Sequence, residues 1–220
     1  MPSLAVLPGN RRLAAADTVL PPGVTPAGTR GVILNVALRL FAERGFGASS
    51  IRDIAKLSGV QPASIYAHYP SKEHVLAEIT RIGHEEHHLR LRTALLECAP
   101  DARQQLIALV KAHVGLHATY SMLAVVANAE LHALSGEFAG ASLELRRQSE
   151  QLIWDVVERG ARLGSFDVPD TWLAVAAIGG MGLRVSHWYT PDCGLSVEQV
   201  AEQYAEFACR IVGAGTPAGT

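Results

Sequence analysis

Apolar residues recur at every third or fourth position through most of the chain, which is the spacing of amphipathic helices. Glycine, proline and capping residues divide this pattern into segments of helical length. About nine helices are expected, and we place their starts at Thr29, Ser50, Pro62, Ser71, Asp101, Met122, Leu143, Thr171 and Ser196. Neither a β-hairpin signal nor an internal repeat accompanies them. The pattern therefore predicts an all-α fold.

The first 28 residues depart from the helical pattern. They contain five prolines and three glycines, a density that prevents a continuous helix. We expect a flexible N-terminal arm over residues 1–28, in which Arg11 and Arg12 are adjacent cations. A short tail is expected over residues 214–220.

The most informative stretch covers residues 50–72, SIRDIAKLSGVQPASIYAHYPSK. It places two short helices on either side of a turn that contains Gly59, and Ser50 with Asp53 forms a capping-box pattern at its start. This is the helix-turn-helix pattern, in which the second helix lies in the major groove of DNA. A generic helical corner, with Tyr66 and Tyr69 in its core, is the alternative interpretation.

Polar side chains of this stretch are candidates for DNA contacts. The exposed face of the second helix would offer groups that bond to base edges or touch a thymine methyl group. Tyrosine and lysine suit backbone phosphates, and serine hydroxyls at a helix N-terminus bind phosphate as well. The predicted DNA-binding residues are Ser49, Ser50, Arg52, Gln61, Ala63, Ser64, Tyr66, His68, Tyr69 and Lys72.

Charge is distributed unevenly although the net charge is only −2. Residues 1–80 hold 8 lysines and arginines against 5 acidic residues, whereas residues 81–220 hold 11 against 16. A basic N-terminal part on an acidic body is typical of a contact with nucleic acid at one end. This asymmetry counts against another interpretation, in which the protein is a helical adaptor that does not bind DNA.

Three runs around the motif extend the pattern: ALRLFAERGF at 37–46, SIRDIAKLSGV at 50–60 and SIYAHYPSKEHVL at 64–76. Together they strongly resemble the TetR family of transcriptional regulators. The resemblance implies a three-helix DNA-binding domain at 29–75 and a helical ligand-binding and dimerisation domain at 76–213. It further implies a homodimer that binds double-stranded DNA at a near-palindromic operator, with repression relieved by a small-molecule effector.

The resemblance makes the helical body a sensor, and pockets for small molecules are mostly apolar with a few polar groups. Ordinary core packing is the alternative role for each candidate residue. The predicted ligand-binding residues are Met122, Val126, Phe138, Trp154, Phe166, Trp172, Met181 and His187.

The run HWYTPDCGLSVEQVAEQY at 187–204 resembles family members tied to lipid, sterol-ring or fatty-acid breakdown, whose effectors are often CoA thioesters. An apolar carboxylate or its CoA ester is therefore the expected effector, and a hydrophobic drug, as in regulators of multidrug efflux, is the rival. Only Arg184 and His187 are placed to bind a phosphate near Trp188.

The run His84-Glu85-Glu86-His87-His88 contains the H-E-x-x-H pattern of zinc hydrolases, in which both histidines bind zinc and the glutamate is the general base. The extended form of that motif needs glycine at 91 and histidine at 94, where this chain has Leu91 and Ala94. We therefore expect no enzyme, no catalytic residue, no cofactor and no metal site, and zinc hydrolysis through His84, Glu85 and His88 stays the alternative.

Cysteine content and hydropathy add two expectations. The three cysteines have no C-x-x-C spacing, which argues against a disulfide framework or a zinc ribbon. The most apolar run, residues 172–183, is well short of the roughly 20 residues that a bilayer requires. A cytoplasmic protein without a membrane partner is expected.

Overall fold

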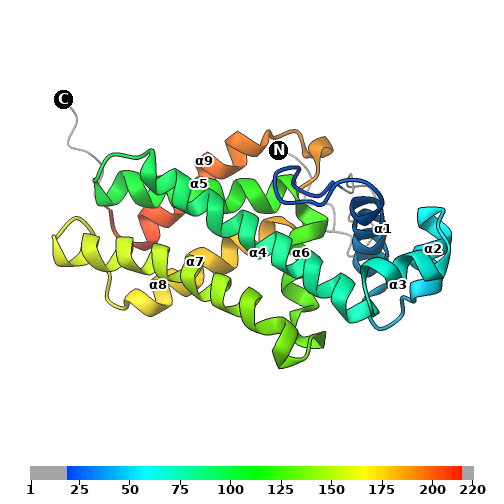
Figure 1. Cartoon of the computed structure of the whole chain (residues 1–220). Helices are drawn as coiled ribbons and strands as arrows, with labels where there is room; N and C mark the ends of the chain where they lie inside the picture. The colour runs from blue at the N-terminus through cyan, green and yellow to red at the C-terminus, as the bar shows by residue number, and fades with distance from the viewer. Residues whose placement is uncertain (1–18, 215–220) are drawn as a thin grey trace. The chain divides into compact units, whose positions relative to one another are not determined.

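The computed structural model describes residues 19–214, where it forms nine α-helices, two 3₁₀ helices and no strand (Figure 1). This confirms the all-α prediction. The α-helices are α1 (Thr29–Arg44), α2 (Ile51–Ser58), α3 (Pro62–His68), α4 (Lys72–Leu96), α5 (Ala102–Thr119), α6 (Ser121–Ala129), α7 (Gly136–Arg162), α8 (Thr171–Val185) and α9 (Val197–Ile211). The 3₁₀ helices are η2 (Leu131–Ala133) and η3 (Pro191–Cys193).

The chain forms two compact units. The first contains the described residues up to Glu86, together with Tyr120–Leu143 and Ser186–Thr190. The second contains His87–Thr119, Glu144–Val185 and the described residues from Pro191 onward. Two long helices, α4 and α7, therefore contribute residues to both units.

The core of the first unit is built by α1, which packs against α2 and α6. Of the apolar positions that the sequence pattern assigns to this helix, Ile33, Ala37, Leu40 and Phe41 are buried and Val36 is partly buried. Their spacing places them on one side of the helix, so their burial fixes which face of α1 points inward.

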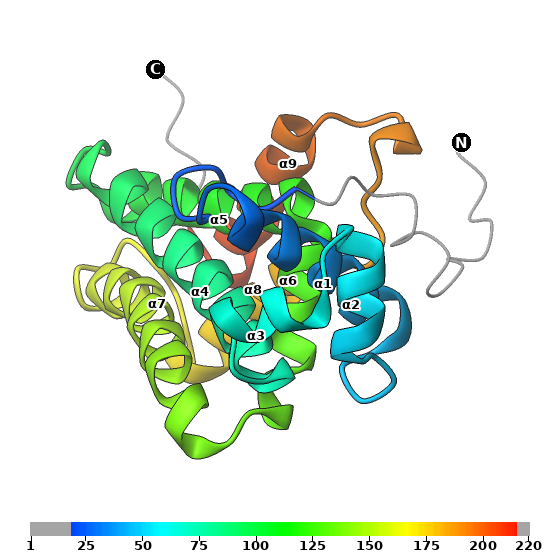
Figure 2. The ribbon, with the colours of Figure 1, turned by 45° about the vertical axis from the view of Figure 1, so that its right-hand side comes forward.

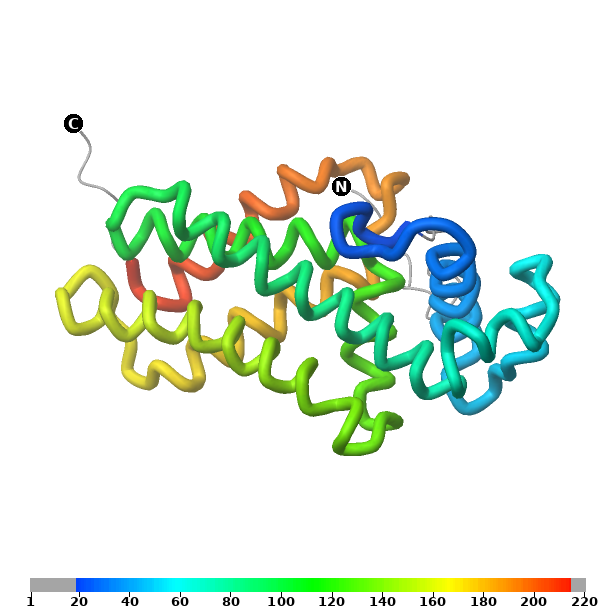
Figure 3. Tube along the Cα trace, in the orientation of Figure 1, coloured from blue at the N-terminus to red at the C-terminus, as the bar shows by residue number. Residues whose placement is uncertain are grey.

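In the second unit, α5 packs against α8 and α9, and Figure 3 shows α5 and α9 running beside each other. Leu106, Val110 and Val114 of α5 are fully buried. The start of α9 repeats the device predicted from sequence: the Ser196 hydroxyl accepts a hydrogen bond from the Gln199 amide, and the Gln199 side chain accepts one from the Ser196 amide.

Several predicted boundaries were wrong. Helix α7 begins at Gly136 rather than Leu143, because the Ser135 carbonyl accepts hydrogen bonds from the amides of Phe138 and Ala139 and so starts the helix early. The helix expected to start at Met122 begins at Ser121 and is followed by the separate 3₁₀ helix η2.

The predicted flexible arm is ordered over residues 19–28. Leu20 is buried in the core of the first unit, and its amide donates to the Asn35 side chain. The rest of the arm, including Arg11 and Arg12, and residues 215–220 of the tail lie outside the described residues.

Across residues 19–214, no single helix is long and apolar enough to cross a membrane. Of the described helices, only α5 and α6 taken together reach that length and apolar composition, and a bend of 97° separates them.

Candidate nucleic-acid interface

Helices α2 and α3 follow one another between α1 and α4 (Figure 2), and local interactions that the sequence encodes fix where they begin and end. The Ser50 hydroxyl accepts a hydrogen bond from the Asp53 amide, and the Asp53 carboxylate accepts one from the Ser50 amide. Gly59 ends α2 in the left-handed conformation at φ 68°, which glycine adopts without a steric cost. Pro62 stands in the first turn of α3, where its missing N–H is not needed.

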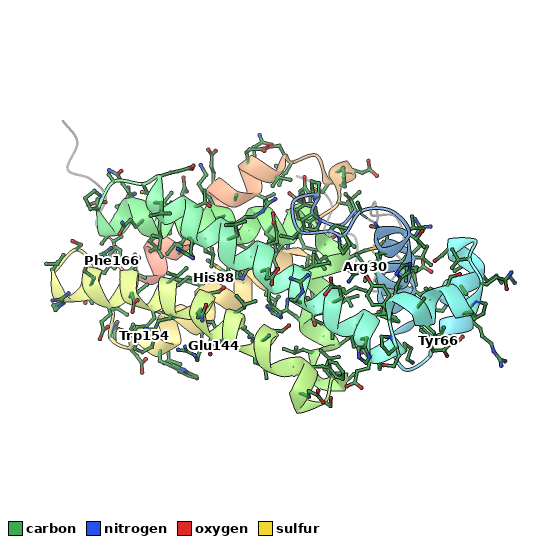
Figure 4. The ribbon with its side chains drawn as sticks, viewed as in Figure 1. Arg30, Tyr66, His88, Glu144, Trp154 and Phe166 are labelled. Atoms are coloured by element: carbon green, nitrogen blue, oxygen red, sulfur yellow. The ribbon has the colours of Figure 1, made fainter. Side chains whose placement is uncertain are left out.

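The inner and outer faces of α3 differ sharply in their exposure to solvent. Ile65 is fully buried, as is Ile54 of α2. The neighbouring Tyr66 is 54% exposed and lies on the outer side of α3 (Figure 4). Seven of the ten predicted DNA-contact residues are exposed, namely Ser50, Arg52, Gln61, Ala63, Ser64, Tyr66 and His68.

Cations accompany this face. Arg52 and Lys56 of α2 are exposed, and Arg44 ends α1 with its side chain in solvent. The Asp53 carboxylate takes part in the helix cap through its hydrogen bonds with Ser50. The Ser50 hydroxyl, and the nearby cations to a smaller degree, hold the pKa of this carboxyl below its ordinary value. The exposed surface of α2 and α3 therefore combines hydrogen-bonding groups with positive charge, as a surface that binds DNA requires.

Two predicted DNA contacts need correction because their side chains are buried in the first unit. The Ser49 side chain is buried and its hydroxyl donates to the Gly45 carbonyl at 2.9 Å. Tyr69 is 3% exposed, with the Arg30 guanidinium 5.5 Å from its ring centroid, and burial raises the pKa of its hydroxyl. Ser49 therefore holds the loop after α1, and Tyr69 belongs to the buried core.

Lys72, another predicted DNA contact, is half-buried, and its contact with DNA stays a prediction. Its ammonium donates to the carbonyls of Phe46 and Ser49, at 2.7 and 2.8 Å, and lies 4.1 Å from the centroid of the Phe46 ring. This residue therefore ties the start of α4 to the loop between α1 and α2. Sequence reasoning assigned Lys72 by type, whereas its partners Phe46 and Ser49 lie 26 and 23 residues earlier in the chain.

The predicted ligand-binding residues are divided between the two units. In the first unit, Met122 and Val126 are buried in the core, Phe138 packs edge-on against the ring of His74, and His187 is exposed with Nδ1 3.2 Å from the Ser186 hydroxyl.

In the second unit, Trp154 and Met181 are half-buried, and Figure 4 marks Trp154 on α7. Phe166 is buried so tightly that a Cβ added at Gly160 would lie 2.1 Å from its ring. Trp172 is 64% exposed, so its placement does not support an enclosed pocket.

A pocket of about 270 Å³ lies in the second unit between α5 and α9. It is lined by charged residues such as Arg103, Lys111 and Glu202, together with Ile107, Ala205, Glu206 and Cys209. None of the eight predicted ligand-binding residues lines it.

The H-E-x-x-H run does not build a hydrolytic zinc site. Glu85, the expected general base, is paired with the Arg81 guanidinium. His88 Nδ1 lies 3.3 Å from the Ser149 hydroxyl, and burial lowers the pKa of this imidazole. Among the described residues, the histidines that do gather are His87, His113 and His117. Sequence reasoning missed the last two, although their i,i+4 spacing on α5 is itself a signal that two side chains share a helix face.

Two family models match the chain. A model described as "Bacterial regulatory proteins, tetR family" matches residues 33–79, and one described as "Tetracyclin repressor-like, C-terminal domain" matches residues 99–212. Among curated proteins, the chain is 32% identical over 181 residues to the HTH-type transcriptional repressor KstR2 of Rhodococcus jostii strain RHA1, a match that covers 81% of this chain and 88% of that protein.

Solved structures give the same relationship. A bacterial regulatory protein in the tetR family from Rhodococcus RHA1 superposes with a TM-score of 0.80 at 30% identity, covering 87% of this chain and all of that one. The ketosteroid transcriptional regulator KstR2 of Mycobacterium tuberculosis superposes with a TM-score of 0.77 at 26% identity, covering 84% of this chain and 94% of that one.

Proposed function

Because this chain belongs to the TetR family of bacterial transcriptional regulators, we propose that it is a homodimeric repressor that a small apolar effector releases from its operator. The chain is a regulator and not an enzyme, so the alternative of a zinc hydrolase based on His84, Glu85 and His88 is wrong. Acting on DNA, the protein would work in the cytoplasm.

One observation carries the DNA-binding part of the proposal: α3 exposes its polar side chains over a core that holds Ile65 fully buried. Gln61, Ser64 and His68 would read base edges, and Ala63 would touch a thymine methyl group. Tyr66 would contact backbone phosphate, as would Ser50 and Arg52 at the start of α2. In this proposal residues 29–75 bind DNA, while residues 76–213 bind the effector and the second subunit.

Exposed apolar side chains support a dimer through α8 and α9. Trp172 and Leu173 of α8 are 64% and 57% exposed, and Phe207 and Ile211 of α9 are 39% and 37% exposed. A Cβ added at Gly180 of α8 would meet nothing within 4 Å, so this helix leaves room for a close partner. A two-fold dimer requires a near-palindromic operator, with its recognition helices about 34–36 Å apart or a multiple of that distance.

The names of the relatives support an apolar effector. Repressors named KstR2 are similar over most of the chain, and one of them is described as a ketosteroid regulator. An apolar carboxylate or its CoA ester fits this relationship. Helix α4 begins beside the DNA-binding helices and continues into the second unit, so it is the element through which the effector would act. A coupling of about 1–3 kcal/mol weakens operator binding roughly 5–150-fold.

The test is a binding assay with DNA taken from around the protein's own gene, followed by calorimetry of the candidate effector with and without that DNA. We expect tight binding to a near-palindrome, and we expect operator to weaken effector binding by the same factor by which the effector weakens operator binding. Unchanged effector affinity at saturating operator would contradict release by this effector. Release by hydrophobic drugs, but not by carboxylates or CoA esters, would favour the efflux regulator.

A further inference from the structure

Three imidazoles gather inside the second unit, away from the DNA-binding helices in sequence. His113 and His117 stand one turn apart on α5, and His87 comes from α4. Each of the three offers one ring nitrogen, and these atoms all lie within 4.8 Å of one another. His87 Nε2 and His113 Nδ1 are only 2.8 Å apart. We refer to these three residues as the histidine triad.

Hydrogen bonds to backbone carbonyls fix two of the rings. His113 Nε2 lies 3.1 Å from the Gly179 carbonyl of α8, and His117 Nδ1 lies 2.7 Å from the His113 carbonyl. A carbonyl can only accept, so each of these nitrogens carries the proton. The opposite nitrogens, His113 Nδ1 and His117 Nε2, are then lone-pair donors. Histidines that bind metals show this arrangement, with one ring nitrogen donating to a carbonyl and the other binding the ion.

Packing holds the triad in place. His113 and His117 are 6% and 3% exposed, while His87 is half-buried and gives access from solvent. A Cβ added at Gly182 would lie 2.2 Å from His113 Cδ2, so α8 approaches this ring as closely as glycine allows. A ligand set whose rings are already oriented loses little conformational freedom when an ion binds.

The chemistry of the donors selects the ion. Three neutral imidazoles suit borderline transition metals such as Zn²⁺, Co²⁺ and Ni²⁺, whereas Mg²⁺ and Ca²⁺ prefer oxygen ligands. We propose that His87, His113 and His117 together bind one divalent transition-metal ion of this class, with a fourth position left for water or another small ligand. On binding, His87 gives its Nε2 lone pair to the ion and carries its proton on Nδ1 instead, so no net proton is released by this ring.

This site is distinct from the H-E-x-x-H pattern of the sequence. That pattern pairs His84 with His88, whereas the triad uses the intervening His87 and two residues of α5. His88 therefore provides a matched control, because it is the next residue on the same helix, is also half-buried and points to Ser149 instead.

The experiment uses the full-length chain without a polyhistidine tag, stripped of metal by a chelator and titrated with Zn²⁺ or Co²⁺. We expect one ion per chain and a visible Co²⁺ absorption typical of four-coordinate nitrogen and oxygen ligands. His87→Gln and His117→Gln should each weaken binding by roughly 100-fold or more, since even the loss of an outer hydrogen-bond partner typically costs about 10–100-fold. His88→Gln should bind as the wild type does.

Circular dichroism of the metal-free variants establishes that they are folded. X-ray absorption of zinc-loaded wild type decides the question without any variant: we expect imidazole nitrogens at about 2.0–2.1 Å. Sulfur ligation, a stoichiometry well below one, or equal affinity of the wild type and both triad variants would overturn the proposal.

Discussion

The two compact units differ in how their functional side chains are brought together. In the first unit, the exposed residues of the candidate DNA-binding surface all lie between positions 50 and 68. In the second unit, the imidazoles of the triad come from α4 and α5, and the carbonyl that orients His113 lies 66 residues further along the chain. A contiguous motif places its side chains by local rules, whereas the triad exists only once distant helices have packed.

The largest expected effect tests whether the two faces of α3 are separate in function. Ile65→Ala should lower the free energy of unfolding by about 2–5 kcal/mol, because it leaves a cavity in a fully buried site. The adjacent Tyr66→Ala should change it by less than about 0.5 kcal/mol, as is usual on a surface. Tyr66→Ala should instead weaken DNA binding and reduce the salt slope by about 1.

Urea unfolding and fluorescence anisotropy of labelled DNA at several salt concentrations measure both effects. If Tyr66→Ala bound DNA as the wild type does at every salt concentration, the outer face of α3 would not be the contact surface.

The sequence predicts side-chain positions well where they are set by local contacts, and poorly where distant parts of the chain must first pack together. The Ser50 cap, the left-handed Gly59 and the start of α3 at Pro62 are set by neighbours in sequence, and all were predicted correctly. Ser49 and Tyr69 were misassigned because their burial is set by the packed core of the first unit, which for Tyr69 includes the Arg30 guanidinium far away in sequence. For the triad, the spacing of His113 and His117 is visible in the sequence, but nothing there brings His87 to them.

The role of Lys72 offers the second test. Lys72→Met should destabilise the protein by about 1.5–3 kcal/mol, because two carbonyls lose a charged hydrogen-bond donor. Lys56→Met on α2 is the control, since Lys56 is exposed and its loss should change stability by less than about 0.5 kcal/mol. A Lys72→Met variant with wild-type stability in urea and a reduced salt slope for DNA would instead support the phosphate contact that the sequence predicts.

The close approach of α8 to His113 gives the third test, in the second unit. Gly182→Ala should cost about 1–3 kcal/mol, because its new methyl group would overlap the His113 ring and the packed interior must move to accept it. Gly115→Ala on α5 is the matched control: nothing lies within 4 Å of its added Cβ, so the higher helix propensity of alanine should stabilise the protein by up to about 1 kcal/mol. Equal stability of the two variants in urea would contradict the packing that orients the triad.

The smallest expected effect compares the same device in both units, since α2 and α9 each begin with a capping box. Ser50→Ala and Ser196→Ala should each cost about 0.5–2 kcal/mol at neutral pH, because each removes the acceptor for a helix N-terminal amide. The residue that closes the box differs: Asp53 in the first cap titrates and Gln199 in the second does not, although the pKa of the neighbouring Glu198 is lowered by its own backbone N–H and by the Ser196 hydroxyl. The Ser50 hydroxyl lowers the pKa of Asp53 below its ordinary value, so the contribution of this carboxylate is complete above that value and is lost as the pH falls through the lowered pKa.

The cost of Ser50→Ala should therefore shrink between about pH 5 and pH 3, because protonated Asp53 has already weakened the cap in the wild type. In a Glu198→Gln background the cost of Ser196→Ala should stay constant, because neither that position nor Gln199 then titrates. Urea unfolding of both variants over this pH range measures the difference, and Asp53→Asn in the background of the Ser50 variant isolates the carboxylate. A cost of Ser50→Ala that is the same at both ends of the range would mean that the Asp53 charge does not contribute to the cap, and the two units would then use one pH-independent device.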